Sequence, residues 1–157
     1  MKMKKPKYFP WVLLSLGVGL LSGFSVREGI KAYSALAEKP ALTLPAALFP
    51  VVWTVLYVLM GVGAARVSAA PESRSRDRGR NLFVVQLAVN FFWSLIFFNA
   101  GAYGFALVWL GLLWVLVFAM ILNFREADRL AGLLQLPYLV WLTFAAYLNY
   151  GVWRLNG

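Results

Sequence analysis

Aromatic and amide side chains recur at helical spacing in three stretches of this chain. In the first stretch, Phe49, Trp53 and Tyr57 follow one another every four residues, so they lie along one face of a helix. Similar spacing recurs in two later sets, which are Gln86, Asn90, Trp93 and Phe97, and then Tyr138, Trp141, Ala145 and Asn149. Flat rings with a few hydrogen-bonding groups are the usual lining of a small-molecule site. The three sets therefore favour a cavity that binds flat ring molecules. Nine of these residues are the predicted ligand site: Phe49, Trp53, Tyr57, Gln86, Asn90, Trp93, Trp141, Ala145 and Asn149.

The same residues also have a simpler interpretation, namely packing. Aromatic rings fill the cores of helix bundles, and a buried amide that bonds a neighbouring helix contributes about 0.6 to 2 kcal/mol. For any single residue, packing is the commoner role. The set as a whole favours a cavity because Trp53, Trp93 and Trp141 lie well inside apolar runs, whereas anchoring tryptophans lie at headgroup depth.

The composition excludes several kinds of chemistry. Histidine and cysteine are absent from the sequence, so the commonest haem ligand, the usual general base and any thiolate metal site are missing. No Asp, Glu, Lys or Arg lies inside the apolar runs, whereas proton-driven transporters usually place one at mid-membrane. We therefore expect no catalytic residue, no metal site and no required cofactor.

Hydropathy predicts the elements that must position these side chains. Hydrophobic residues make up 62% of the 157 residues and charged ones only 13%, which is typical of a membrane protein. Uncharged runs of 19, 26, 44 and 24 residues cover 8–26, 40–65, 81–124 and 130–153. One span needs about 20 residues, so the 44-residue run holds two spans, separated by a turn at Asn99 to Gly104.

We therefore predict an all-α fold, a single-domain integral membrane bundle of five transmembrane helices. The expected helices cover about 8–26, 46–66, 81–99, 104–124 and 130–154. A long first loop is expected from Arg27 to about Pro45. Gly19 and Gly23 form a G-x-x-x-G pattern, which is typical of close helix packing.

The distribution of positive charge predicts the orientation. With five spans, eleven of the fifteen Lys and Arg residues fall on the side of the N-terminus and four on the other. The positive-inside rule places the N-terminus inside, and the C-terminus and first loop outside. The net charge of +9 is then explained by topology and by contact with the lipid bilayer, and not by nucleic acid.

An alternative is that the first apolar run is a cleaved signal peptide, but Arg27 to Lys31 separates it from the small residues of a cleavage site.

Three segments resemble a known family. "EKPALTLPAALFPVVWTVLYVLMGVGAARV", "QLAVNFFWSLIFF" and "LPYLVWLTFAAYLNYGVWRLN" closely resemble helices two, three and five of the translocator protein family, also called TspO or tryptophan-rich sensory protein. The resemblance covers nearly the whole chain in order. It implies a five-helix membrane protein that binds porphyrins, haem, cholesterol and benzodiazepine-type drugs.

The resemblance also implies roles for individual residues. Trp53 and Trp141 correspond to a tryptophan pair that faces bound tetrapyrrole, and Ala145 to a small pocket residue. The resemblance further covers the helix-three motif and the end of the fifth helix, with Gln86, Asn90, Trp93, Asn149, Tyr150 and Arg154. One departure stands in the first loop, where Leu42 and Leu44 replace the family's tryptophan and first proline, while Pro45 is kept.

A proposed cholesterol pattern also fits the end of the fifth helix, as Leu148, Tyr150 and Arg154. An interfacial role is the simpler explanation for Arg154 beside Trp153.

Three functions remain open at this stage. The first is a receptor, expected to be a homodimer, that holds porphyrin, haem or sterol between its helices under the first loop. In that case Arg27, Lys31 or Lys39 would meet the ligand's propionates. The second is transport of tetrapyrroles or sterols, and the third is light-dependent porphyrin breakdown that uses the tryptophan pair.

Overall fold

The computed structural model describes residues 3–35 and 48–156, and these contain helices and connecting segments but no strand. In chain order the helices are α1 (Tyr8–Ser25), α2 (Arg27–Ser34), α3 (Leu48–Ala69), α4 (Arg74–Ser94), the π-helix η1 (Leu95–Asn99), α5 (Tyr103–Ala127), α6 (Arg129–Leu133) and α7 (Leu136–Asn156). Five segments within the described residues are long and apolar enough to cross a membrane: α1, α3, α4 with η1, α5, and α6 with α7. The expected all-α bundle of five spans is confirmed.

Two expectations about the elements were wrong. The third span was expected to begin near residue 81, but α4 begins at Arg74, where the Ser73 side chain accepts a hydrogen bond of 3.0 Å from the Arg76 N–H. Charged residues can extend a helix into water, so hydropathy marks only the part of a helix that lies in lipid. Part of the expected first loop is also helical, since α2 follows α1 almost directly.

The fifth span is divided near its start. Asp128 caps the short helix α6 by accepting a hydrogen bond of 3.3 Å from the Ala131 N–H, and a turn then leads into α7. The same carboxylate holds Arg66 at the end of α3, with Nε to Oδ2 at 2.6 Å and Nη2 to Oδ1 at 3.3 Å. This two-point contact fixes the end of α3 to the α5–α6 corner.

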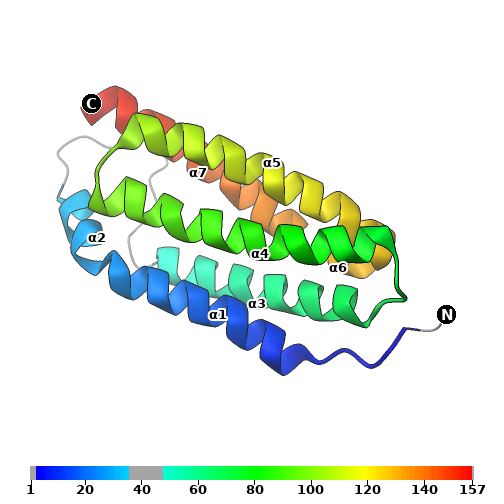
Figure 1. The fold of residues 1–157 in the computed structure, drawn as a ribbon. Helices are drawn as coiled ribbons and strands as arrows, with labels where there is room; N and C mark the ends of the chain where they lie inside the picture. The colour runs from blue at the N-terminus through cyan, green and yellow to red at the C-terminus, as the bar shows by residue number, and fades with distance from the viewer. Residues whose placement is uncertain (1–2, 36–47, 157) are drawn as a thin grey trace.

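Figure 1 shows the helices side by side, with the two chain ends at opposite ends of the bundle. Neighbouring helices pack in the pairs α1 with α3, α4 with α5, and α5 with α7. The expected turn between the third and fourth spans is confirmed, and within it Gly101 has a φ of 61°, a left-handed conformation that favours glycine.

One half of the bundle is solidly packed. Fully buried side chains from α3, α4 and α5 fill the half towards the N-terminus, namely Met60, Ala64, Val67, Phe83, Val117, Met120 and Phe124. At this end α1 and α3 approach closely, because a Cβ on Gly61 would lie 2.5 Å from the Val12 backbone. The Ser15 hydroxyl adds a hydrogen bond of 2.6 Å to the Tyr57 carbonyl oxygen.

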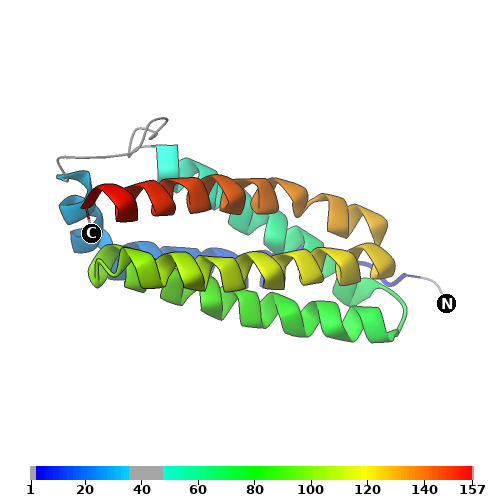
Figure 2. The same ribbon diagram turned by 90° about the horizontal axis from the view of Figure 1, so that it is seen from above.

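The other half is looser, because α1 and α3 separate. A Cβ on Gly19 would lie 2.6 Å from the Tyr57 ring, whereas one on Gly23, a turn later, would have no atom within 4 Å. In Figure 2 the start of α3, in cyan, stands away from α1, in blue, and the two helices converge towards the other end. The Gly19 and Gly23 pattern therefore provides close packing at Gly19 and open space at Gly23.

Candidate ligand cavity

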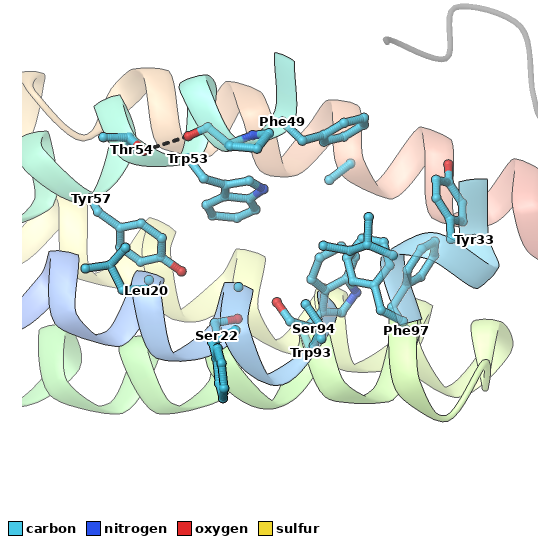
Figure 3. A pocket seen from close by; sticks show the side chains of 18 of the residues that line it. Leu20, Ser22, Tyr33, Phe49, Trp53, Thr54, Tyr57, Trp93, Ser94 and Phe97 are labelled. Atoms are coloured by element: carbon cyan, nitrogen blue, oxygen red, sulfur yellow. Dashed lines mark hydrogen bonds between the residues drawn. The ribbon is translucent and has the colours of Figure 1, made fainter. Parts of the chain in front are cut away.

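The looser half contains a cavity of about 530 Å³. Its walls come from the second half of α1, from α2, from the first half of α3, from the end of α4 with η1, and from the middle of α7. Figure 3 shows side chains from these elements converging on a common space. Small-molecule sites commonly measure about 300 to 1,000 Å³, so the size suits a single ring ligand.

Seven of the nine residues predicted for the ligand site line this cavity. They are Phe49, Trp53, Tyr57, Trp93, Trp141, Ala145 and Asn149. The rings form a connected wall, because the Trp141 centroid lies 5.7 Å from that of Phe49 and 6.2 Å from that of Trp53, at interplanar angles of 70° and 87°. Trp93 stacks on Phe97 on the facing side, with centroids 5.2 Å apart.

The two other predicted residues, Gln86 and Asn90, do not line the cavity. They lie in a buried polar layer, here defined as Tyr57, Gln86, Asn90 and Tyr138, which joins α3, α4 and α7. The Tyr57 hydroxyl donates to Asn90 Oδ1 at 2.9 Å, Asn90 Nδ2 donates to the Tyr138 oxygen at 2.7 Å, and Tyr138 donates to Gln86 Oε1 at 2.7 Å. The chain of donors and acceptors is continuous, so it holds three helices in register below the cavity.

A second polar link holds the wall opposite. The Trp93 indole N–H donates to Asn149 Oδ1 at 3.1 Å, and Asn149 Nδ2 donates to the Tyr103 carbonyl oxygen at 2.8 Å. Asn149 therefore fixes the orientation of the Trp93 ring. Its amide is satisfied by the protein, so its main role here is positioning.

The described lining residues are all uncharged. The lining residues with hydroxyl groups are Ser22, Tyr33, Ser34, Thr54, Tyr57 and Ser94. The Thr54 hydroxyl is occupied, because it donates to the Pro50 carbonyl oxygen at 2.7 Å, the bond drawn in Figure 3. A ligand inside the cavity would thus meet mainly apolar surface, with weak hydrogen-bonding groups and no ion.

Residues of α1, of α2 and of the junction between them line the cavity but were not predicted from the sequence. They are Leu16, Gly19, Leu20, Ser22, Gly23, Phe24, Val26, Ile30, Tyr33 and Ser34. The G-x-x-x-G pattern was the available signal, but it was interpreted only as packing. Nothing in the apolar run of α1 distinguishes the side chains that face the cavity from those that face lipid.

The π-helix η1 explains how α2 joins this wall. Phe97 and Phe98 are adjacent in sequence and both line the cavity. A Cβ on Gly29 of α2 would lie 2.5 Å from the Phe98 carbonyl oxygen, so the two helices touch through their backbones. The Tyr33 ring packs on those of Phe97 and Phe98, with centroids 5.4 and 5.6 Å away. Partial burial, together with nearby Tyr103, raises the pKa of the Tyr33 hydroxyl. π-helical turns occur frequently at functional sites.

The cavity is open on one side. Leu20 and Phe24 of α1 line it and yet are 75% and 65% exposed, and Pro50 and Thr54 of α3 are exposed lining residues too. These residues border the place where α1 and α3 separate, at a depth where both helices are apolar. Within the described part of the chain, the opening therefore faces the lipid side of the bundle.

The structure divides the predicted sterol residues between two surfaces. Leu148 is buried and lines the cavity, whereas Tyr150 and Arg154 are exposed on the outside of α7. Tyr150 contacts Trp153, with ring centroids 6.1 Å apart.

The predicted rim cations also differ in their settings. The Arg27 guanidinium lies 4.0 Å from the ring centroid of Phe24, a lining residue, while Lys31 pairs with Glu28 at 3.4 Å. Lys39 and the departures at Leu42 and Leu44, together with Pro45, lie outside the described residues.

Comparison with known proteins supports one family. The model of the TspO/MBR family matches residues 11–154. The protein CrtK of Rhodobacter capsulatus is 44% identical over 120 residues, which cover 76% of this chain and 75% of that protein. The tryptophan-rich protein TspO of Chlorobaculum tepidum is 35% identical over 91% of each chain. The human translocator protein is 38% identical over 90% of this chain and 85% of its own.

Proposed function

We propose that this chain, which belongs to the TspO/MBR family, is a membrane receptor that binds flat apolar ring molecules such as porphyrin, haem or sterol. The observation that carries this proposal is the uncharged cavity of about 530 Å³, walled by Phe49, Trp53, Trp93 and Trp141. Ring faces attract flat ligands through stacking and burial, without the directional demands of an ion pair. A porphyrin or haem would be a ligand here, and not a cofactor needed for catalysis.

The rim supports porphyrin within this class. Arg27 sits over Phe24 at the mouth of the cavity and has no ion-pair partner among the described residues. A porphyrin can place its ring against the tryptophans and its propionates towards this cation, whereas sterols offer only a hydroxyl. Charge-assisted hydrogen bonds of this kind are stronger than neutral ones.

Titration of the purified protein with protoporphyrin tests the proposal. Because several tryptophans line the cavity, binding should quench tryptophan fluorescence in a saturable way. Trp53→Phe should weaken binding several-fold, since Trp53 is a wall residue. Trp114→Phe is the matched control, because Trp114 stacks on Phe118 and donates to Thr143 away from the cavity. Absence of saturable quenching in the folded wild type would contradict the proposal.

Two alternatives rest on particular observations. The side opening bordered by Leu20 and Thr54, together with the name of the human relative, favours transport, which flux of protoporphyrin into proteoliposomes would measure. The close approach of Trp53 and Trp141 favours light-dependent porphyrin breakdown, which loss of the porphyrin absorption band under illumination would measure. We keep binding as the primary function, because both alternatives also require a ligand inside this uncharged aromatic cavity.

We also propose the orientation and the assembly. The excess of Lys and Arg on the N-terminal side supports an inside N-terminus with the C-terminus and α2 outside. Since the chain lacks cysteine, single cysteines introduced at Ser75 and at Asn156 would report the two sides through membrane-impermeant labels. We propose a homodimer as the functional unit, and light scattering of the detergent-solubilised protein would give its mass.

A further inference from the structure

A second hollow, of about 300 Å³, lies at the opposite end of the bundle from the cavity, between α1 and α4. Its lining residues are Trp11 on α1 and Asp77, Arg80, Asn81 and Val84 on α4. The four α4 residues recur at spacings of three, one and three, so they share one face of that helix. This hollow is separate from the proposed ligand cavity and shares no residue with it.

The Arg80 side chain lies over the ring of Trp11 in this hollow. The guanidinium carbon lies 5.9 Å from the Trp11 ring, and the Trp11 ring packs edge-on against buried Phe83, with centroids 5.7 Å apart. A cation placed over a tryptophan face is attracted by the ring. This contact favours a position of the guanidinium beside the Trp11 ring.

The Arg80 guanidinium has no anionic partner among the described residues. The ion pairs found there involve Lys31, Arg66 and Arg76 instead. Asp77, one turn earlier, pairs with Arg76, with Nε to Oδ1 at 3.3 Å. Arg80 is only partly exposed, and a partly buried charge without a counter-ion is costly. The hollow therefore has room for an anion at Arg80, while Asp77, its one acidic lining residue, is paired with Arg76.

The position of Arg80 along α4 decides the kind of anion. Arg80 is the last charged residue before the apolar run that starts at Asn81, and Val84, one turn deeper, is 55% exposed. The cation thus lies at the membrane surface with an apolar wall directly beneath it. The preceding part of α4 adds Arg74, Arg76 and Arg78 against one carboxylate, Asp77, so the local field is positive.

We propose that this hollow binds the headgroup of an anionic phospholipid, with its phosphate on Arg80 and Asn81 and an acyl chain along Val84. A free phosphate would use the two polar groups but would leave the apolar wall in contact with water or with unrelated lipid. A phospholipid satisfies both parts of the site, since basic pockets between spans are known binding places for anionic headgroups.

Native mass spectrometry of the purified protein with added phosphatidylglycerol or phosphatidylcholine tests this inference. We expect wild type to retain phosphatidylglycerol about tenfold more strongly than Arg80→Gln, the change expected when one charge-assisted contact is lost. Arg78→Gln is the matched control, because it removes the same charge from an exposed position of the same helix. Arg80→Lys keeps the charge without the planar fork and should retain an intermediate amount of lipid.

The outcomes separate the alternatives. Equal loss in Arg78→Gln and Arg80→Gln would show a diffuse electrostatic effect and would overturn the site, as would equal retention of phosphatidylcholine by wild type. Complete displacement by inorganic phosphate at millimolar concentration would show a phosphate site and would overturn the lipid assignment. If Arg80→Gln fails to fold, two other measurements test the site: lipid retention by Arg80→Lys, and the effect of salt on retention by wild type. Full retention of phosphatidylglycerol by Arg80→Lys at high salt would count against the proposal.

Discussion

Replacing Ala145 by leucine separates a binding role for this residue from a packing role. Ala145 is 7% exposed, lies on α7 between Trp141 and Asn149, and lines the cavity. The substitution adds three carbon atoms at a point where the neighbouring volume of about 530 Å³ is open to a ligand. The added atoms therefore enter space that a ligand would use.

The expected magnitudes follow from this geometry. In a filled core, added carbons cost about 1 to 3 kcal/mol, but here the open volume accepts them. We expect the melting temperature to stay within about 2 °C of wild type. A ligand ring pushed away from residue 145 would lose buried apolar surface equivalent to about two methylene groups, at about 0.8 kcal/mol of binding free energy each. Porphyrin affinity should then fall roughly tenfold, since tenfold corresponds to about 1.4 kcal/mol.

Two measurements on the same preparation check this prediction. Fluorescence quenching by protoporphyrin gives the affinity, and thermal unfolding in detergent gives the stability. Ala106→Leu is the matched control, because Ala106 is fully buried in α5 and does not line the cavity. That variant should lose about 1 to 3 kcal/mol of stability while its folded fraction binds normally. If Ala145→Leu behaves in the same way, Ala145 is a packing residue and the ligand site lies elsewhere.

Further predictions concern the elements around the cavity. Tyr138→Phe removes the hydroxyl that joins Asn90 to Gln86, so thermal unfolding should show a loss of about 1 to 3 kcal/mol, and an unchanged melting curve would contradict the polar layer. Gly29→Ala places a carbon 2.5 Å from the Phe98 carbonyl oxygen, so hydrogen exchange in α2 should accelerate, and wild-type exchange would refute the close contact. Arg154→Ala should leave porphyrin affinity within about twofold, because Arg154 is exposed on the outside of α7, and complete loss in a folded variant would argue against this placement. Added haem should give no low-spin bis-ligated absorption spectrum, because the sequence has no histidine or cysteine.

The number of spans could be predicted from the sequence because lipid imposes a length and an apolar composition on each one. Helix starts could not be predicted equally well, because Ser73 and Asp128 cap the starts of α4 and α6 outside the apolar runs. The π-helical turn at η1 leaves no mark in hydropathy, so the docking of α2 on Phe98 was also not foreseen.

The candidate site could be predicted only in part for a related reason. Periodicity shows which side chains share a face, and it grouped Trp53 with Tyr57 and Trp141 with Ala145, which line one cavity in the structure. It does not show how far along the face the space extends. Gln86 and Asn90 continue the face of Trp93, yet they lie where the helices have closed and their amides bond to Tyr138.

The polar layer of Tyr57, Gln86, Asn90 and Tyr138 limits how deep a guest molecule can go. On its far side, Met60, Phe83 and Phe124 leave no exposed surface, so a molecule in the cavity meets a closed floor part-way through the bundle. Passage to the opposite face of the membrane would need three helices to part and their buried hydrogen bonds to break together. The lateral opening between α1 and α3 offers a route with no such barrier. A ligand of the proposed kind would therefore exchange with one leaflet, and its transport to the other leaflet would require the polar layer to open.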